Sequence, residues 1–367
     1  MDGLSGRTSI DSDAVRVVVA TVVHRSDDAR IFHRQVSALL DSGNEVVLLA
    51  PGPSVDSTLR TGLRHRLVQR SAGRRRLRAL FSMARALLIE SRRADLTIIH
   101  DPELVLLAAW IRSPRIWDVH EDLVAQVEDK DWVPDGLQPL ARGFARLLER
   151  EGARRFSVMV AEDGYRNRFE EARVVRNLPV VPATVRPTGS DRVVYLGRVS
   201  HGRGLDVLLE VARLMDGECA VEVVGPLDPG LEQGLFDRTP GVLYRGPRPN
   251  PEALDIIEGS RAGLCLLEDL PNYRHSMPTK VLEYMARGLP VITTPNPEAS
   301  RVVLANGCGL VVPFGDPRAV VDAIRELGDP FERRRLAENG RRAMSRSLDW
   351  KSEADRFVSY CEEIAGG

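Results

Sequence analysis

The sequence has little of several features that would place the protein in a special environment. It has only four cysteines, and no two of them form a Cys-x-x-Cys pair, so we expect reduced, mostly buried thiols and no zinc site. They are Cys219, Cys265, Cys308 and Cys361. The longest strongly apolar stretch, Leu104 to Ile111, is far too short to cross a membrane. Residues 1–13 are polar and acidic without the apolar centre of a signal peptide, so we expect a disordered tail on a cytoplasmic protein.

The sequence also has almost no net charge. Its 51 basic and 52 acidic residues cancel to −1, so no global field draws the protein to nucleic acid. Lysine is scarce, because 48 of the basic residues are arginine. With 367 residues, 43% of them hydrophobic and 28% charged, the chain can form two globular domains with full cores. Disordered, collagen-like and coiled-coil classes are excluded.

Apolar runs of strand length alternate with segments of helical period along the whole chain. This alternation predicts an α/β protein with two doubly wound, parallel, Rossmann-like halves. Strands are expected at residues 15–23, 45–50, 63–69, 95–100, 115–119, 157–161 and 173–175, and then at 193–197, 220–224, 242–246, 263–267, 291–294 and 309–312. Helical stretches are expected at residues 31–40, between the strands from 63–69 to 173–175, and near 204–215, 251–258, 278–287 and 318–327.

Residues 177–190 interrupt this rhythm with three prolines and favour an interdomain linker. We therefore expect an N-terminal domain at residues 14–180, a linker at 181–190 and a C-terminal domain at 191–345. Residues 346–367 are expected to form a helix that packs back toward the N-terminal domain. An active site is expected in the cleft between the two domains, at the carboxyl ends of both sheets.

Residues 273–292 hold the sharpest local pattern. Pro278 is placed as a first-turn helix residue, and the helix is expected to end at Gly288. A helix N-terminus at the carboxyl end of a sheet offers free N–H groups to a phosphate. Thr279 and Glu283 share one helix face, so Glu283 is suited to accept hydrogen bonds from a ribose diol. A capped surface helix with a solvated glutamate fits the same pattern equally well.

Residues 196–206 form a second pattern, in which a strand runs into a glycine-rich turn and then a helix. Arg198 and Arg203 lie beside Gly202 and Gly204, so backbone and guanidinium groups could approach an anion there. The turn is neither a Walker A loop nor a G-x-G-x-x-G fingerprint. By itself such a turn is common.

Taken together, the motifs resemble the retaining family 4 glycosyltransferases, also called glycosyl transferases group 1, which have the GT-B fold. The helix Pro278 to Val291 matches the family's pattern almost letter for letter. Five further segments match in the same order along the chain: His24 to Phe32, His100-Asp101-Pro102, Asp118-Val-His-Glu121, Gly197-Arg198 with Arg203-Gly204-Leu205-Asp206, and Asn306 to Pro317. The resemblance therefore spans nearly the whole chain.

The resemblance implies a role for each matching residue. Arg198 and Arg203 would stabilise the diphosphate leaving group, Glu283 would hold the ribose, and His120 would act near the transferred sugar. The implied donor-binding set is Gly197, Gly202, Gly204, Arg245, His275, Pro278, Thr279, Lys280 and Glu283. The residues implied on the acceptor side are His24, His100, Asp101 and Glu121. His275 departs from the family, because many members carry a glutamate in its place.

The implied reaction moves a hexose from a UDP-, GDP- or dTDP-sugar to a hydroxyl with retention of the anomeric configuration. The acceptor would be a glycan or lipid-linked intermediate, or a small secondary metabolite. No cofactor and no metal are expected, because the two arginines and the helix N-terminus neutralise the leaving diphosphate. The expected route is front-face attack without a protein nucleophile.

Two other functions fit parts of the sequence. The main rival is a sugar-nucleotide epimerase on the same fold, which binds the same donor and transfers nothing. A more distant rival is a nucleic-acid-binding protein that uses residues 60–93, which hold 11 arginines and one acidic residue, Glu90. The near-zero net charge and the lack of base-stacking aromatics disfavour it. The same stretch fits either a solvated basic helix face or peripheral contact with the inner face of an anionic membrane.

Overall fold

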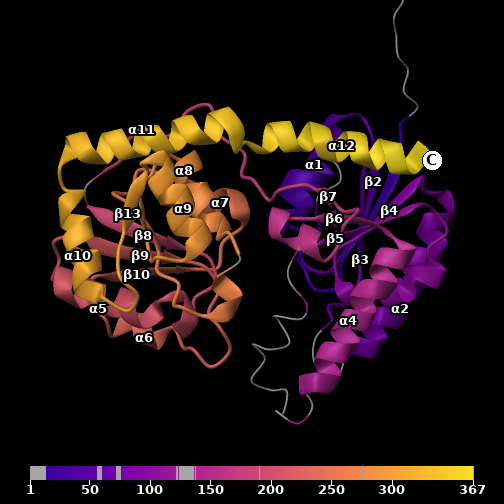
Figure 1. Ribbon diagram of the computed structural model, residues 1–367, viewed down its shortest axis with the longest axis horizontal. Helices are drawn as coiled ribbons and strands as arrows, with labels where there is room; N and C mark the ends of the chain where they lie inside the picture. Colours follow the sequence, from indigo (N-terminus) through magenta and orange to yellow (C-terminus); the bar gives the residue numbers. More distant parts are fainter. Residues whose placement is uncertain are drawn as a thin grey trace, which may run out of the picture. The chain divides into compact units, whose positions relative to one another are not determined.

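A computed structural model describes residues 14–55, 60–71, 76–120, 123, 136, 138–189, 191–274 and 276–366. Its strands form two parallel sheets, one of seven and one of six strands, each accompanied by helices (Figure 1). All thirteen expected strands are present in sequence order. The α/β class with two Rossmann-like sheets is therefore confirmed, while the expected tail at residues 1–13 lies outside the described residues. The expected domain and linker boundaries stay predictions.

The first sheet has the strand order β3-β2-β1-β4-β5-β6-β7. Its strands are β1 (Arg16–Ala20), β2 (Glu45–Ala50), β3 (Leu63–Leu67), β4 (Leu96–Ile99), β5 (Arg115–Val119), β6 (Ser157–Val160) and β7 (Arg173–Val174). In the register of the central strands, Val17 pairs with Val46 on one side and with Leu96 on the other. Strands β1 and β4 are buried along nearly their whole length, which explains why their sequences are continuous β-branched and aliphatic runs.

The helical segments of the first half are η1 (Ile31–Val36), α1 (Ser37–Asp41), α2 (Arg76–Glu90), η4 (Ser91–Arg93), η5 (Pro102–Trp110), α4 (Gln138–Arg155) and η7 (Asp163–Asn167). The helix expected near residue 31 begins as a π-helix before it becomes regular at α1. Between β2 and β3, the described residues 51–55 and 60–62 contain no helix.

The second sheet has the order β10-β9-β8-β11-β12-β13. Its strands are β8 (Arg192–Leu196), β9 (Ala220–Val224), β10 (Val242–Gly246), β11 (Gly263–Cys265), β12 (Val291–Thr293) and β13 (Gly309–Val311). The strand order reverses between β8 and β11, and in doubly wound sheets ligands bind at the carboxyl ends of the strands at such a reversal. The segments after β8 and β11 are therefore the first places to look for a site.

The helical segments of the second half are η8 (His201–Arg203), α5 (Leu205–Met215), α6 (Gly234–Asp237), α7 (Asn250–Ile257), η9 (Pro271–Tyr273), α8 (Thr279–Ala286), α9 (Pro297–Asn306), α10 (Pro317–Glu326), α11 (Pro330–Ser347) and α12 (Trp350–Gly366). The sequence pattern did not single out α6 and α9. Leu348 and Asp349 separate α11 from α12, and α12 accounts for most of the helix expected at residues 346–367.

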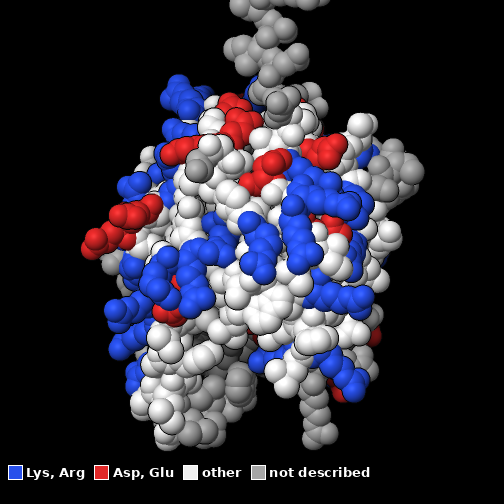
Figure 2. Space-filling model, turned by 90° about the vertical axis from the view of Figure 1, so that its right-hand side faces the viewer, with Lys and Arg blue, Asp and Glu red and all other residues white. Residues whose placement is uncertain are grey.

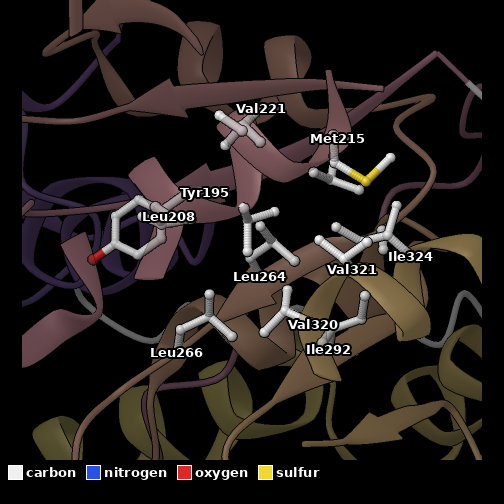
Figure 3. Packing of buried hydrophobic residues seen from close by; sticks show 14 of the residues in the cluster. Tyr195, Leu208, Met215, Val221, Leu264, Leu266, Ile292, Val320, Val321 and Ile324 are labelled. Atoms are coloured by element: carbon white, nitrogen blue, oxygen red, sulfur yellow. The ribbon is translucent and has the colours of Figure 1, made fainter. Parts of the chain in front are cut away.

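Alternate residues of the β8 strand point to opposite faces of the second sheet and into two separate cores. Val193 and Tyr195 join the core under α5 and α10, part of which is shown in Figure 3. Val194 instead joins the core under α7, α8 and α9. This period of two, on a strand covered on both sides, is what a doubly wound sheet requires. All four cysteines are free and buried, as expected. Within the described residues, no helix is long and apolar enough to span a bilayer.

Candidate functional site

The turn after β8 approaches its neighbours so closely that glycine is required both in the turn and at the end of a neighbouring strand. Gly204 has a φ of 88°, and an added Cβ would lie 2.2 Å from the carbonyl oxygen of Leu266, just after β11. A Cβ on Gly225, at the end of β9, would lie 1.9 Å from the carbonyl oxygen of Gly197. The absence of side chains at these glycines therefore lets the turn pack directly against the carboxyl ends of β9 and β11.

Helix α8 is fixed to the same strand ends by one side chain. The Leu196 N–H donates to the Tyr284 hydroxyl at 2.8 Å, and that hydroxyl donates to the Leu264 carbonyl at 3.2 Å. The Tyr284 ring occupies the space where a side chain of Gly263 would lie, because a Cβ there would be 2.2 Å from the ring. The N-terminus of α8 is thereby held beside the turn that follows β8.

A small pocket opens between this turn and the start of α8. Its lining residues are Arg203, Leu267, Tyr273, Ser276, Pro278, Thr279 and Lys280. Helix α8 begins at Thr279, so Pro278 is its N-cap residue and lies one position before the first turn in which the sequence pattern placed it. The first N–H groups of a helix have no partner within the helix, so the pocket combines backbone donors with the Arg203 guanidinium and the Lys280 amine. Its chemistry suits an anion.

The two arginines of the turn lie in different surroundings. Arg203 is half-buried, with its guanidinium 5.8 Å from the centre of the Tyr273 ring. No carboxylate of the described residues lies within 4.0 Å of it. Arg198 is exposed and forms a 2.9 Å ion pair with Asp228. Gly202 lies between the two arginines in sequence. Its backbone packs against the Leu270 side chain, and a Cβ added to Gly202 would lie 2.8 Å from Leu270 Cδ1.

Glu283, implied to hold a ribose, is buried and forms an ion pair within its own helix. Arg287 Nη1 donates to Glu283 Oε2 at 3.1 Å, one helical turn away. Arg287 Nε also lies 3.8 Å from Glu258 Oε1. The solvated glutamate considered from the sequence is therefore wrong, because this carboxylate is only 6% exposed.

Two further residues of the implied donor set have other positions. The Arg245 side chain binds the buried Glu222, with Nε 2.5 Å from Oε1, and Arg192 binds the same carboxylate at 2.9 Å. The Arg245 guanidinium therefore has a structural partner. His275 lies outside the described residues, so its side chain is not placed.

A second cluster of polar side chains lies at the carboxyl end of β5 in the first sheet. Asp118 is completely buried and accepts two hydrogen bonds from Arg30, at 2.9 and 2.7 Å. Gln35 donates to the same carboxylate at 2.7 Å, and His100 Nδ1 lies 3.3 Å from it. His100 therefore lies in the protein interior, bound to Asp118.

His100, Asp118 and His120 bring three ligand atoms within 4.8 Å of one another, which is the spacing of a metal site. The surrounding residues do not fit a cation, because Arg30 already supplies a buried positive charge to Asp118 through two hydrogen bonds. We assign no metal to this cluster. His120 is half-buried at the edge of the cluster, and Glu121 lies outside the described residues.

Asp101 closes the loop that follows β1. Its Oδ2 accepts a hydrogen bond from the Thr21 hydroxyl at 2.8 Å and from the backbone N–H groups of Val22 and Val23, at 2.5 and 3.3 Å. Its Oδ1 lies 3.6 Å from His24 Nε2. Asp101 is almost completely buried and positions the loop, whereas His24 keeps about a third of its side chain exposed, at 34%.

Comparison with known families places both halves of the chain. A family model described as "Glycosyl transferases group 1" matches residues 190–329. A second model, described as "Glycosyl transferase 4-like domain", matches residues 29–182. The chain belongs to the group 1 glycosyltransferases. The family membership that the sequence motifs suggest is thereby confirmed.

Individual relatives of this group 1 glycosyltransferase are distant. It is 24% identical over 318 residues to the MMP alpha-(1->4)-mannosyltransferase of Mycolicibacterium hassiacum, covering 77% of this chain and 74% of the relative. It is 25% identical over 183 residues to the alpha-D-kanosaminyltransferase of Streptomyces kanamyceticus, covering 47% and 45% of the two chains.

Solved structures of glycosyltransferases share its fold. The sucrose-phosphate synthase of Thermosynechococcus elongatus superposes with a TM-score of 0.73 at 18% identity, over 96% of this chain and all (100%) of that one. HepE of Anabaena in complex with UDP-glucose superposes with a TM-score of 0.68 at 14% identity, over 95% and 100% of the two chains. These likenesses show the GT-B fold that the motifs imply.

Several features of the site carry no signal in the sequence. Arg30 and Gln35 hold Asp118 from a segment 80 or more residues away, and only the motif from His24 to Phe32 marks one of them. The Tyr195 ring, on a strand with no unusual sequence pattern, lies under the Lys280 side chain, with Nζ 3.6 Å from the ring centre. Such contacts join distant segments, and a single sequence carries no local pattern for them.

Proposed function

We propose that this group 1 glycosyltransferase transfers a sugar from a nucleotide-sugar donor with retention of configuration. The observation that carries the proposal is the pocket at the carboxyl end of the second sheet. Arg203, Lys280 and the N-terminus of α8 surround it, and none of its described lining residues carries a carboxylate. A diphosphate leaving group needs positive charge and N–H donors that are in place before the reaction begins, because negative charge grows on it in the transition state.

Each neighbouring group has a role in this proposal. Arg203 and the α8 N-terminus bind the diphosphate, and Arg198 reaches it from the exposed side of the turn. Glu283, one turn into α8, accepts hydrogen bonds from the ribose. His120, at the carboxyl end of the first sheet, serves the transferred sugar and the acceptor, and the buried His100, Asp118 and Arg30 hold its strand end rigid.

The relatives support the choice of donor class. HepE of Anabaena is described in complexes with UDP and with UDP-glucose, and the two sequence relatives are named as a mannosyltransferase and a kanosaminyltransferase. Residues 190–329, which match the group 1 model, contain the whole pocket. We propose a hexose as the transferred group and a hydroxyl of a glycan, lipid-linked or small-molecule acceptor as its receiver.

A transfer assay tests this function directly. The full chain is incubated with UDP-, GDP- and dTDP-sugars and sugar acceptors, and the products are examined by mass spectrometry. We expect one donor class to raise the melting temperature and to add one hexose to an acceptor. EDTA should leave the rate largely unchanged, because arginines and helix dipole perform the task that a metal would otherwise have.

Two outcomes of this assay would contradict the proposal. An isomerised donor without any mass gain on an acceptor would identify an epimerase. Loss of transfer with EDTA and its return with Mg²⁺ or Mn²⁺ would overturn the metal-independent mechanism.

We further propose that α2 contacts an anionic membrane surface. Its buried face consists of small and aliphatic residues such as Ala79, Met83 and Leu87. Leu77 and Phe81, which the helical pattern also places among the apolar positions, are instead exposed, at 80% and 79%. Exposed arginines lie at positions 76, 78 and 85 of the same helix and at 92 and 93 in η4, which follows it.

Figure 2 looks onto the side of the molecule that carries the first sheet and shows basic side chains gathered across that face. Apolar side chains that project among arginines suit the boundary of an anionic bilayer, where the rings and methyl groups insert and the guanidinium groups meet phosphate headgroups.

Vesicle sedimentation tests this surface. We expect the protein to bind vesicles that contain anionic phospholipid and to release them at high salt. The double variant L77S/F81S should bind at least tenfold more weakly, since it loses the inserted side chains. A matched control, L304S, changes another exposed leucine (65% exposed) on α9 and should bind like the parent. Equal binding of all three proteins would contradict a role for α2.

A further inference from the structure

Lys280 is a buried lysine for which the described residues provide no counter-charge. It is 7% exposed, and its Nζ makes no hydrogen bond to any described residue. No carboxylate among those residues lies within 4.0 Å of it. It is nevertheless one of the side chains that line the pocket at the start of α8. Burying an ammonium group without hydrogen bonds costs free energy, so a lysine at this position needs an explanation.

The groups that face Lys280 come from four neighbouring segments, and none is an anion at neutral pH. The ring of Tyr195 on β8 lies 3.6 Å from Nζ, and burial raises the pKa of its hydroxyl. The buried Cys265 thiol on β11 also has a raised pKa because of burial. Arg203 from η8 is a like charge, and Tyr273 from η9 lines the same pocket.

Lys280 also occupies the second position of α8, where the helix dipole opposes a positive charge. Burial, with Arg203 adding to it, lowers the pKa of Lys280 to about 7. Three physical effects therefore disfavour the ammonium form in the free protein. An anion in the pocket would reverse this balance, because opposite charge nearby favours the charged form.

We propose that Lys280 is a third cation for the donor's diphosphate and that it takes up a proton from solvent when the diphosphate binds. The inference rests on the proposed function, since it assigns this pocket to a nucleoside diphosphate. The neutral amine gains one proton from the buffer and becomes an ammonium ion beside the phosphate oxygens. Arg198 and Arg203 are charged throughout and exchange no proton on binding.

The sign of the resulting pH dependence follows from linkage. An opposite charge raises a neighbouring pKa by roughly one to three, so we take about 9 for Lys280 in the complex. Between the two values the complex holds more protons than the free protein, so affinity falls as the pH rises. Binding at pH 8 should take up about 0.8 proton per nucleotide. The terminal phosphate, with a pKa of about 6, is already ionised there and does not contribute.

Calorimetry of the full chain measures this uptake. Whichever of UDP, GDP and dTDP binds is titrated at pH 8 in buffers of different ionisation enthalpy, and the slope gives the number of protons. Lys280→Met should take up none. Its affinity should be about 50-fold below the parent at pH 7 but only about twofold below at pH 9, where the parent lysine is neutral before binding.

Two controls keep the test independent of folding. Lys351→Met changes an exposed lysine on α12 and should match the parent in affinity and proton uptake. The chain has only three lysines, Lys130, Lys280 and Lys351, so ¹³Cε labelling gives three signals that the two variants assign. Without any substitution, the Lys280 signal should titrate near neutral pH and move to higher pH when nucleotide is present.

The outcomes separate the two proposals. Nucleotide binding without proton uptake, an affinity loss in Lys280→Met that is equal at pH 7 and pH 9, or a Lys280 signal that titrates above pH 10 in the free protein would each overturn this inference alone. Failure of all three nucleotides to bind the parent at any pH would overturn the proposed function and this inference with it.

Discussion

Replacing Arg203 by alanine is expected to lower sugar transfer by roughly 100-fold or more, with a much smaller loss of donor affinity. The guanidinium lines the pocket and meets no carboxylate among the described residues, so its charge is available to the leaving diphosphate. Because the negative charge on that group grows as the sugar bond breaks, the arginine stabilises the transition state more than the bound donor. The measurement is kcat and KM for the donor on one preparation.

The matched control is Arg213→Ala. Arg213 lies on α5 of the same half of the chain, is exposed and pairs with Glu210 at the surface. Its removal should change neither constant. Arg198→Ala should resemble Arg203→Ala in direction, with a smaller effect because its exposed guanidinium is shared with Asp228. An Arg203→Ala protein with parental kcat would remove this residue from the mechanism.

Replacing Glu283 by alanine is expected to weaken donor binding by about 2–4 kcal/mol, roughly 30- to 1,000-fold. The carboxylate is buried, so ribose hydroxyls that lose it find no water in exchange. Its removal also leaves the buried Arg287 without one of its two carboxylates, so the free energy of unfolding should fall as well. Donor affinity by calorimetry and the melting temperature must therefore be measured together.

Glu258→Ala separates the two effects. Glu258 is the other carboxylate near Arg287, and it precedes β11 in sequence, whereas Glu283 lies one turn into α8. Its removal should lower the melting temperature while the donor affinity stays near that of the parent. If the two variants lose stability and affinity in the same proportion, Glu283 is a structural partner of Arg287 and the ribose assignment is wrong.

The regular architecture could be predicted from the sequence because it rests on local patterns. A strand buried on both faces must be apolar along its length, and a helix that covers it must be apolar at every third or fourth position. All thirteen strands were expected on this basis. The short α6 and the half-exposed α9 were not, since a helix of four residues has no period to detect and α9 buries only Ala299 and Val303.

The pocket motifs could also be located in the sequence, because glycine and proline have few structural alternatives. Gly204 is required because the turn takes a φ of 88° at this position, and Pro278 marks where α8 begins. These residues depend on backbone geometry that is set within a few positions. Their positions in the sequence therefore indicate where the pocket lies.

Only the tertiary structure decided which charges are satisfied. The sequence places Lys280 and Glu283 three positions apart on one helix, yet the first lacks a counter-charge within the described residues and the second binds Arg287. It likewise gives no sign that Asp118 is held by Arg30 from 88 positions away, or that Leu77 and Phe81 face outward. Burial and ion pairing depend on which distant segments meet, and a local pattern does not contain that information. The sequence therefore determined the sheets, the turns and the family, while the fold determined the electrostatic state of each side chain.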